Sequence, residues 1–334
     1  MDEIEDLPSN HPLVGMPTGY VYDAPSVALV KGTVALACGA ENGIAGAASG
    51  VNYFNLTAFS ADWLSRGDCV TSRRRIIDLG ADGKILEPLA QETGICDGCS
   101  FGEAAFESWC ARYVMTGCGP KPRETSFLWP YLGGRELSIT GRGDSGACPP
   151  YSAKLYHDVG ALPVNCGGKF DMTNLPPHGS GSQEELCVQM RDNPRLLQEW
   201  VDAAAPFKCP VFSPDDAEMV ADCVKTGRVV TFGCGYQSRE AIVGSNGVSL
   251  LYRLNGGHET RCTGFFRLNG RLGFLKSESW WNILFPGSKW PNHRVVIQTD
   301  DGPRTLYPGQ CAVWADEWMR CQPECWGIGA PGSL

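Results

Sequence analysis

The sequence lacks a long apolar segment and an excess of basic residues. Its longest candidate segment, residues 27–45, is interrupted by Lys31 and Glu41, whereas a membrane-spanning helix needs about 20 predominantly apolar residues. Lys and Arg number 28 against 37 Asp and Glu, which gives a net charge of −9. Because phosphate groups are bound by clustered Lys and Arg, we expect neither a membrane nor a nucleic acid as a partner.

The N-terminus lacks the features of a signal peptide. Residues 1–15 are acidic and polar, with neither a basic segment nor an apolar one following it, so we expect no secretion by this route. The 16 cysteines are then better explained as buried thiols, metal ligands or catalytic groups than as a disulfide framework. The alternative is that the protein is assembled into an extracellular particle and that its cysteines are oxidised to disulfides after the particle is released.

The chain divides into three parts that differ in composition and in predicted secondary structure. Residues 1–85 are rich in Gly and Ala, and we expect a β-rich N-terminal extension with strands near 20–22, 26–30 and 33–38. Residues 86–225 form a helical half and residues 226–334 a β half with a C-terminal tail, an α+β pattern. Apolar spacing predicts helices over 100–116, 151–160, 196–204 and 215–225, the last capped by Ser213 with Pro214 in the first turn. Strands are predicted over 228–232, 248–254, 263–268, 272–276 and 294–299, with a hairpin turn at Asn269-Gly270.

The candidate catalytic cysteines lie in the segment at the start of the first long helix. Cys96 and Cys99 lie at the predicted helix start, where the helix dipole and free backbone N–H groups stabilise a thiolate. The same N–H groups, with the side-chain amide of Gln91, are suited to bind an oxyanion. A thiol nucleophile also needs a base, and His258 in the β half is the candidate, with Glu278 available to orient its imidazole.

This layout resembles the papain-like cysteine peptidases, in which a Gln precedes a G-x-C-x-x-C element and a later His is followed by N-S-W. The matching residues here are Gln91, residues 94–99, His258 and Glu278-Ser279-Trp280. A closer resemblance is to a papain-like group of bacteriophage and planctomycete genomes, through residues 134–136, 141–146, 159–163, 198–200 and 287–291. The resemblance implies a papain-like fold in which the N-terminal catalytic helix packs, with the helical half, against a β-barrel-like antiparallel half.

Two cysteines compete for the role of nucleophile. The papain pattern read without gaps through the helix selects Cys99, whereas a Q-x-x-G-x-C start selects Cys96, to which the distance from Gln91 is better suited. If Cys99 is the nucleophile, the resemblance implies that Cys96 is a structural cysteine paired with Cys148. Glu278 stands where the family has Asn, which fits either a carboxylate that orients His258 or a degenerate site.

Two functions follow as hypotheses. The first is a thiol peptidase or amidase that acts on a peptide or protein with Cys96 or Cys99, His258, Glu278 and Gln91, and that needs no cofactor or metal. The second is a catalytically silent papain-like scaffold that binds other virion proteins as a structural component of a bacteriophage particle. The expected location is accordingly the cytoplasm or such a particle. A zinc site built from Cys96, Cys99, Cys321 and Cys325 is a third, weaker interpretation of the C-x-x-C spacing.

Overall fold

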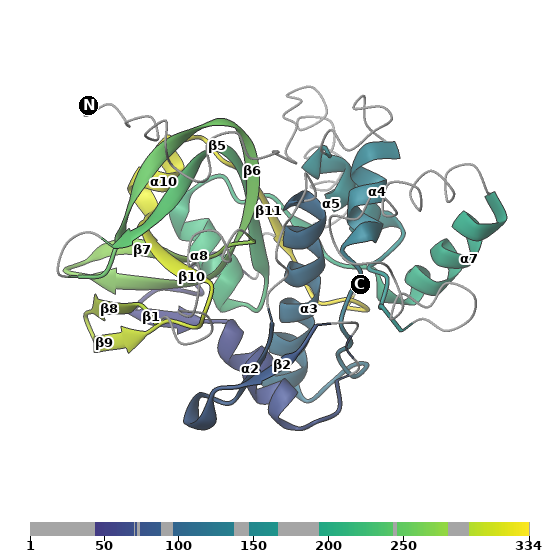
Figure 1. Ribbon diagram of the computed structural model, residues 1–334, viewed down its shortest axis with the longest axis horizontal. Helices are drawn as coiled ribbons and strands as arrows, with labels where there is room; N and C mark the ends of the chain where they lie inside the picture. The colour runs from purple at the N-terminus through teal and green to yellow at the C-terminus, as the bar shows by residue number, and fades with distance from the viewer. Residues whose placement is uncertain are drawn as a thin grey trace.

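The computed structural model describes residues 44–69, 71, 74–87, 96–136, 147–165, 194–242, 246–279 and 294–333. Figure 1 shows helix α3 (Cys96–Thr116) in the middle of the molecule, with an antiparallel sheet on one side. Helices α4 (Leu128–Glu136), α5 (Pro149–Asp158) and α7 (Pro194–Ala204) lie on the other side. The α+β class expected from the sequence is therefore confirmed.

The β half is one seven-stranded sheet with the order β10-β7-β6-β5-β11-β4, to which β1 adds beside β6. Every pairing in it is antiparallel. The strands are β1 (Tyr53–Asn55), β4 (Val211–Phe212), β5 (Val229–Ile242), β6 (Ser249–Leu268), β7 (Arg271–Ser277), β10 (Gln310–Trp314) and β11 (Glu324–Ile328). The expectation of a barrel-like half is wrong for the described strands, because the two edge strands β10 and β4 do not pair with each other. β4 has only two residues, and both pair with β11.

Smaller elements surround this sheet. Two hairpins stand apart from it, β2 (Ile76–Asp78) with β3 (Lys84–Leu86), and β8 (Val296–Thr299) with β9 (Gly302–Thr305). The remaining helices are α2 (Thr57–Ser65), α8 (Ala217–Lys225) and α10 (Ala315–Arg320), with short 3₁₀ turns η2 (Gly80–Asp82) and η5 (Ala205–Phe207). The segment from residue 44 onward is tied to α8, because the Asp222 carboxylate accepts the backbone N–H groups of Gly46 and Ala48, both at 2.6 Å.

Most predicted elements are present with shifted ends. The helix predicted over 100–116 is α3 and starts at Cys96, and the strands predicted over 248–254 and 263–268 are the two ends of β6. The predicted cap of α8 is wrong. Asp216 caps this helix by accepting the Met219 N–H at 2.8 Å, while the Ser213 hydroxyl donates to the Cys325 carbonyl of β11. The strands predicted near 20–22, 26–30 and 33–38 lie outside the described residues.

Helix α3 is buried along most of its length, since every residue from 96 to 111 is inside the protein. Its Phe101 ring meets Tyr156 of α5 edge-on at 5.9 Å between centroids. On the sheet side, the Ser108 hydroxyl donates to the Ile328 carbonyl at 2.7 Å and accepts the Val229 N–H at 3.0 Å. The helix is therefore held by apolar packing toward α5 and by hydrogen bonds toward β5 and β11.

The first turn of α3 approaches the chain before α4 so closely that only glycine fits. A Cβ atom on Gly98 would lie 2.3 Å from the Phe127 carbonyl oxygen, which is backbone and cannot swing away. Gly98 stands between Cys96 and Cys99, so this contact helps to set where the two thiols lie.

We predict that Gly98→Ala lowers the free energy of unfolding by about 1–2 kcal/mol, because an overpacking penalty of about 2–3 kcal/mol exceeds the gain in helix propensity of about 1 kcal/mol. Urea denaturation checks this prediction. Met115→Ala, at an exposed position of the same helix, is the control and should change stability much less. A Gly98→Ala protein as stable as the control would contradict the close approach.

Candidate functional site

A buried histidine–glutamate pair joins the two strands β6 and β7. His258 Nε2 lies 2.6 Å from Glu278 Oε1, and both side chains are almost completely buried. Glu278 follows directly after β7, and its backbone N–H donates to the Gly309 carbonyl at 3.1 Å. The antiparallel pairing of β6 with β7 thus brings together two residues twenty positions apart in the sequence.

Cys96 lies against the same stretch of β6. It is the first residue of α3, and its Sγ atom accepts the backbone N–H of Glu259 at 3.3 Å. Glu259 directly follows His258, so the first turn of α3 contacts the strand that carries the imidazole. A further bond fixes this approach, since the Ser100 hydroxyl donates to the Glu259 carbonyl at 2.9 Å.

Cys99 lies one turn farther along α3, in a different environment. The charged groups with the largest effect on its thiol are Glu103, Arg74 and Arg261, and Asp97 has a smaller effect. Burial raises the pKa of Cys99 to about 12, and the Glu103 carboxylate adds to that rise. Cys96 is a free thiol in this structure, so the bridge to Cys148 expected if Cys99 were the nucleophile is not formed.

Carboxyl groups surround Cys96. Asp97 is the second residue of α3, and its Oδ2 accepts the Ser152 hydroxyl at 2.6 Å. Burial raises the pKa of Asp97 to about 8, and the pKa of Glu259 is raised well above its ordinary value by burial, Asp97 and Glu324. Glu324, from β11, accepts the Trp326 indole N–H at 2.6 Å. Two carboxyls, Asp97 and Glu259, therefore act on the Cys96 thiol, and Glu324 acts on both of those carboxyls.

This environment reverses the effect expected of the helix start. Burial raises the pKa of the Cys96 thiol well above its ordinary value, and the Glu259 carboxyl raises it further, while the Glu259 N–H acts in the opposite direction. The expectation of a thiolate stabilised by the helix dipole is therefore wrong for the site as it stands. The raised pKa favours the protonated thiol of Cys96 over its thiolate.

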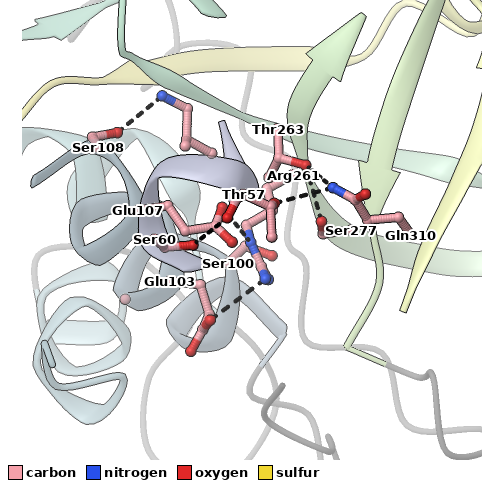
Figure 2. A network of polar contacts seen from close by, with 12 residues as sticks. Thr57, Ser60, Ser100, Glu103, Glu107, Ser108, Arg261, Thr263, Ser277 and Gln310 are labelled. Atoms are coloured by element: carbon pink, nitrogen blue, oxygen red, sulfur yellow. Dashed lines mark hydrogen bonds and ion pairs between the residues drawn. The ribbon is translucent and has the colours of Figure 1, made fainter. Parts of the chain in front are cut away.

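Two arginines form ion pairs with the glutamates of α3, and Figure 2 shows the part of this network made by Glu103, Glu107 and Arg261. Arg74 bonds to both Glu103 and Glu124, all three with side chains less than a tenth exposed. Arg261 of β6 lies 3.5 Å from Glu103 and 3.6 Å from Glu107. Burial raises the pKa of Glu107 to about 7, because Arg261 offsets only part of the cost of desolvation.

A hydrogen-bond cluster adjoins this network. The Gln310 amide donates to Thr57 at 3.1 Å and to Thr263 at 2.7 Å, and the Thr263 hydroxyl meets the Ser277 hydroxyl at 3.1 Å (Figure 2). A polar cavity of about 30 Å³ lies between the two networks and is lined by Glu278 among others. Glu278, which contacts His258, thus lines the same cavity as residues of α2, α3, β6 and β10.

Of the residues predicted from the sequence, His258 contacts Glu278, and Cys96 contacts the backbone N–H of Glu259, the residue after His258. Gln91 and Trp280 lie outside the described residues. Asp97 and Glu259 were missed, although both adjoin residues that were singled out. The one feature of the sequence that could have identified them is that each is an acidic residue within a segment otherwise suited to burial.

Among the described residues, no group of three or more His, Cys, Asp and Glu side chains is placed to hold a metal ion. Over the same residues, no helix is both long enough and apolar enough to cross a bilayer.

Comparison with solved structures finds proteins described as cysteine proteases. Xylellain from Xylella fastidiosa is similar with a TM-score of 0.47 at 14% identity, over 99% of this chain and 98% of that one. Procathepsin B S9 from Trypanosoma congolense has a TM-score of 0.42 at 14% identity, over 74% of this chain and 72% of that one. The proform of Amb a 11, a ragweed pollen allergen, has a TM-score of 0.35 at 11% identity, over 73% of this chain and 62% of that one. No family model matches the chain, and a search of curated proteins finds no match either.

The buried acids predict how stability depends on pH. The pKa of Asp97 is about 8 in the folded protein and about 3.9 in an unfolded chain, so the folded state holds the proton more tightly between these values. The free energy of unfolding should therefore fall as pH rises from about 4 to 8. In Asp97→Asn this contribution is absent, and the loss of stability between pH 5 and pH 8 should be smaller, as measured by urea denaturation.

Asp68→Asn is the matched control, because Asp68 forms an exposed ion pair with Lys121. It should follow the native pH dependence. An Asp97→Asn protein with the native pH dependence would show that Asp97 does not hold a proton in the fold.

Proposed function

We propose that the chain is a papain-like thiol peptidase or amidase, with Cys96 as nucleophile, His258 as base and Glu278 as the group that orients it. The proposal rests chiefly on the buried pair in which His258 Nε2 lies 2.6 Å from Glu278 Oε1. His258 is on β6, and the backbone N–H of the next residue, Glu259, donates to Cys96 Sγ. A nucleophile, a base and an acid that orients the base are the three groups that acyl transfer needs.

The proposed roles of the two imidazole nitrogens follow from the contact between His258 and Glu278. With Nε2 bound to Glu278, Nδ1 is the ring nitrogen that takes the proton from Cys96. The sulfur then forms a bond to the substrate carbonyl carbon, and the first N–H groups of α3 are the donors available to the oxyanion, with Gln91 as the side-chain donor predicted from the sequence. His258 gives the proton to the departing amine as the C–N bond breaks, which leaves a thioester on Cys96.

The second half of the reaction reverses the roles. His258 takes a proton from water, the hydroxide attacks the thioester carbonyl, and Cys96 leaves with a proton from His258. The net change is hydrolysis of an amide to an acid and an amine. Because Cys96 is a thiol at rest, the Glu278 carboxylate matters most in the first step, where it stabilises the imidazolium that forms.

Alkylation of native protein by iodoacetamide, located by mass spectrometry, tests this assignment. Cys96 should be labelled, and His258→Ala should slow its labelling at least about tenfold, because the proton no longer has an acceptor. Cys99→Ala is the control and should leave labelling of Cys96 intact. Labelling of Cys99 in preference, or labelling of Cys96 that ignores His258, would overturn the assignment.

Substitutions of Glu278 distinguish its role in orienting the His258 ring from the effect of its negative charge on the imidazolium. Glu278→Gln keeps an oxygen that accepts the Nε2 proton but removes the negative charge opposite the imidazolium. We expect kcat/KM on a fluorogenic peptide to fall about tenfold in Glu278→Gln and about 10²–10⁴-fold in Glu278→Ala. Equal activity of Glu278→Ala and the native protein would remove Glu278 from the mechanism.

A catalytically silent scaffold is the second candidate, and the burial of Cys96 favours it. The thiol has no exposed surface, and its pKa is raised by burial and Glu259, both unlike a reactive cysteine. On this alternative, native protein neither turns over peptides nor reacts with iodoacetamide at Cys96 until it is unfolded. The same two assays therefore decide between the candidates.

A further inference from the structure

A second pocket lies away from the residues assigned to catalysis. It has a volume of about 350 Å³, within the range of small-molecule sites, and is formed where β1 and α2 meet η2 and the β8–β9 hairpin. We call it the aromatic pocket, after Tyr53, Phe54, Phe59 and Tyr307 in its lining. None of Cys96, His258 and Glu278 contributes to it.

The aromatic side chains supply apolar walls and are themselves held in place. Phe54 and Phe59 lie 5.7 Å apart between ring centroids. The Arg304 guanidinium lies 5.3 Å from the Tyr53 ring centroid, and the Lys225 ammonium lies 4.5 Å from that of Phe54. Cation–π contacts of this kind restrict the two rings, so the walls exist before a ligand arrives.

Polar groups of balanced charge converge on the same pocket. Arg294 Nη1 lies 3.4 Å from Asp82 Oδ2, and both residues line the pocket. The Tyr307 phenol is close enough to Tyr53, Asp82 and Arg294 for each to affect its pKa, which burial raises to about 12. Thr305 also lines the pocket. The pocket therefore offers several hydroxyls, one anion and one cation.

One buried amide pair fixes both tyrosines. Asn55 Nδ2 donates to the Tyr53 hydroxyl at 3.3 Å and to Gln310 Oε1 at 3.0 Å. The same Gln310 oxygen accepts the backbone N–H of Tyr307 at 3.0 Å. Because Asn55 and Gln310 are buried and bonded to each other in both directions, the Tyr53 phenol and the Tyr307 backbone are preorganised, which lowers the entropic cost of binding.

We propose that the aromatic pocket binds a neutral sugar ring, free or at the end of a glycan. A charged ligand gains little, since Asp82 and Arg294 pair with each other and the Arg304 and Lys225 cations already contact the Tyr53 and Phe54 rings. A purely apolar ligand would leave the phenols, Thr305 and the ion pair without new partners. A sugar ring presents C–H faces to aromatic walls and hydroxyl groups that both donate and accept at its edge. That combination matches the pocket group for group.

The test uses the full chain carrying Cys96→Ala, so that the result does not depend on turnover. Saturation-transfer NMR is run with glucose, galactose, mannose and N-acetylglucosamine, and isothermal titration measures any binding. We expect at least one sugar to bind with a Kd of about 1 mM or tighter. Asp82→Asn and Tyr307→Phe should each weaken that binding at least about fivefold, while thermal denaturation shows that the variants are folded.

Asp62→Asn is the matched control, because Asp62 forms an exposed ion pair with Arg66 on α2, outside the pocket lining. It should bind as the parent does. Three results would overturn the proposal: no saturation transfer to any sugar, equal affinity in Asp82→Asn and Asp62→Asn, or tighter binding of acetate or glycine than of every sugar.

Discussion

The burial of α3 is the constraint on which the rest of the structure depends. This helix lies between the sheet and the helical half, and it carries Glu103 and Glu107 into the interior. Buried carboxylates are tolerated only when they are paired, and Arg74 and Arg261 reach them from either side of α3 in the sequence. The interior charges thus tie an N-terminal segment and strand β6 to the central helix.

The same burial sets the chemistry proposed for Cys96. A helix start at the surface would favour the thiolate, but here the helix start is inside and faces Asp97 and Glu259. The interior favours uncharged forms, so carboxyls and thiol all keep their protons. The proposed mechanism therefore relies on His258 and Glu278 to generate the nucleophile, rather than on a preformed thiolate.

Sequence reasoning was most successful where local pattern decides the structure. The apolar spacing that produces α3 and the Asn269-Gly270 turn between β6 and β7 are both visible in the sequence. Helix α4 was missed because Pro130, Gly133 and Gly134 disfavour a helix. Its glycines are needed for close packing, since a Cβ on Gly133 would lie 2.5 Å from the Leu155 side chain.

In the candidate site, too, the residues that belong to a sequence motif were predictable and those that depend on tertiary contacts were not. His258 and Glu278 were predicted from a motif order, but the choice between Cys96 and Cys99 depends on which side of α3 meets β6, and that is a tertiary contact. Glu259 was missed for the same reason. A residue next to an inward-facing one on a strand is expected to face solvent, yet here α3 and Thr231 cover that side as well.

The central claim is that β6 places His258 beside Cys96, and a bifunctional alkylating reagent tests it most directly. In 1,3-dibromoacetone each bromide is displaced in turn, so a reagent that has reacted with a thiol bridges to an imidazole only if the nitrogen is within reach. On this account native protein yields a Cys96–His258 crosslinked peptide in mass spectrometry, and His258→Ala yields none. A crosslink from Cys99 to His258, or a Cys96 adduct that never bridges to His258, would contradict it.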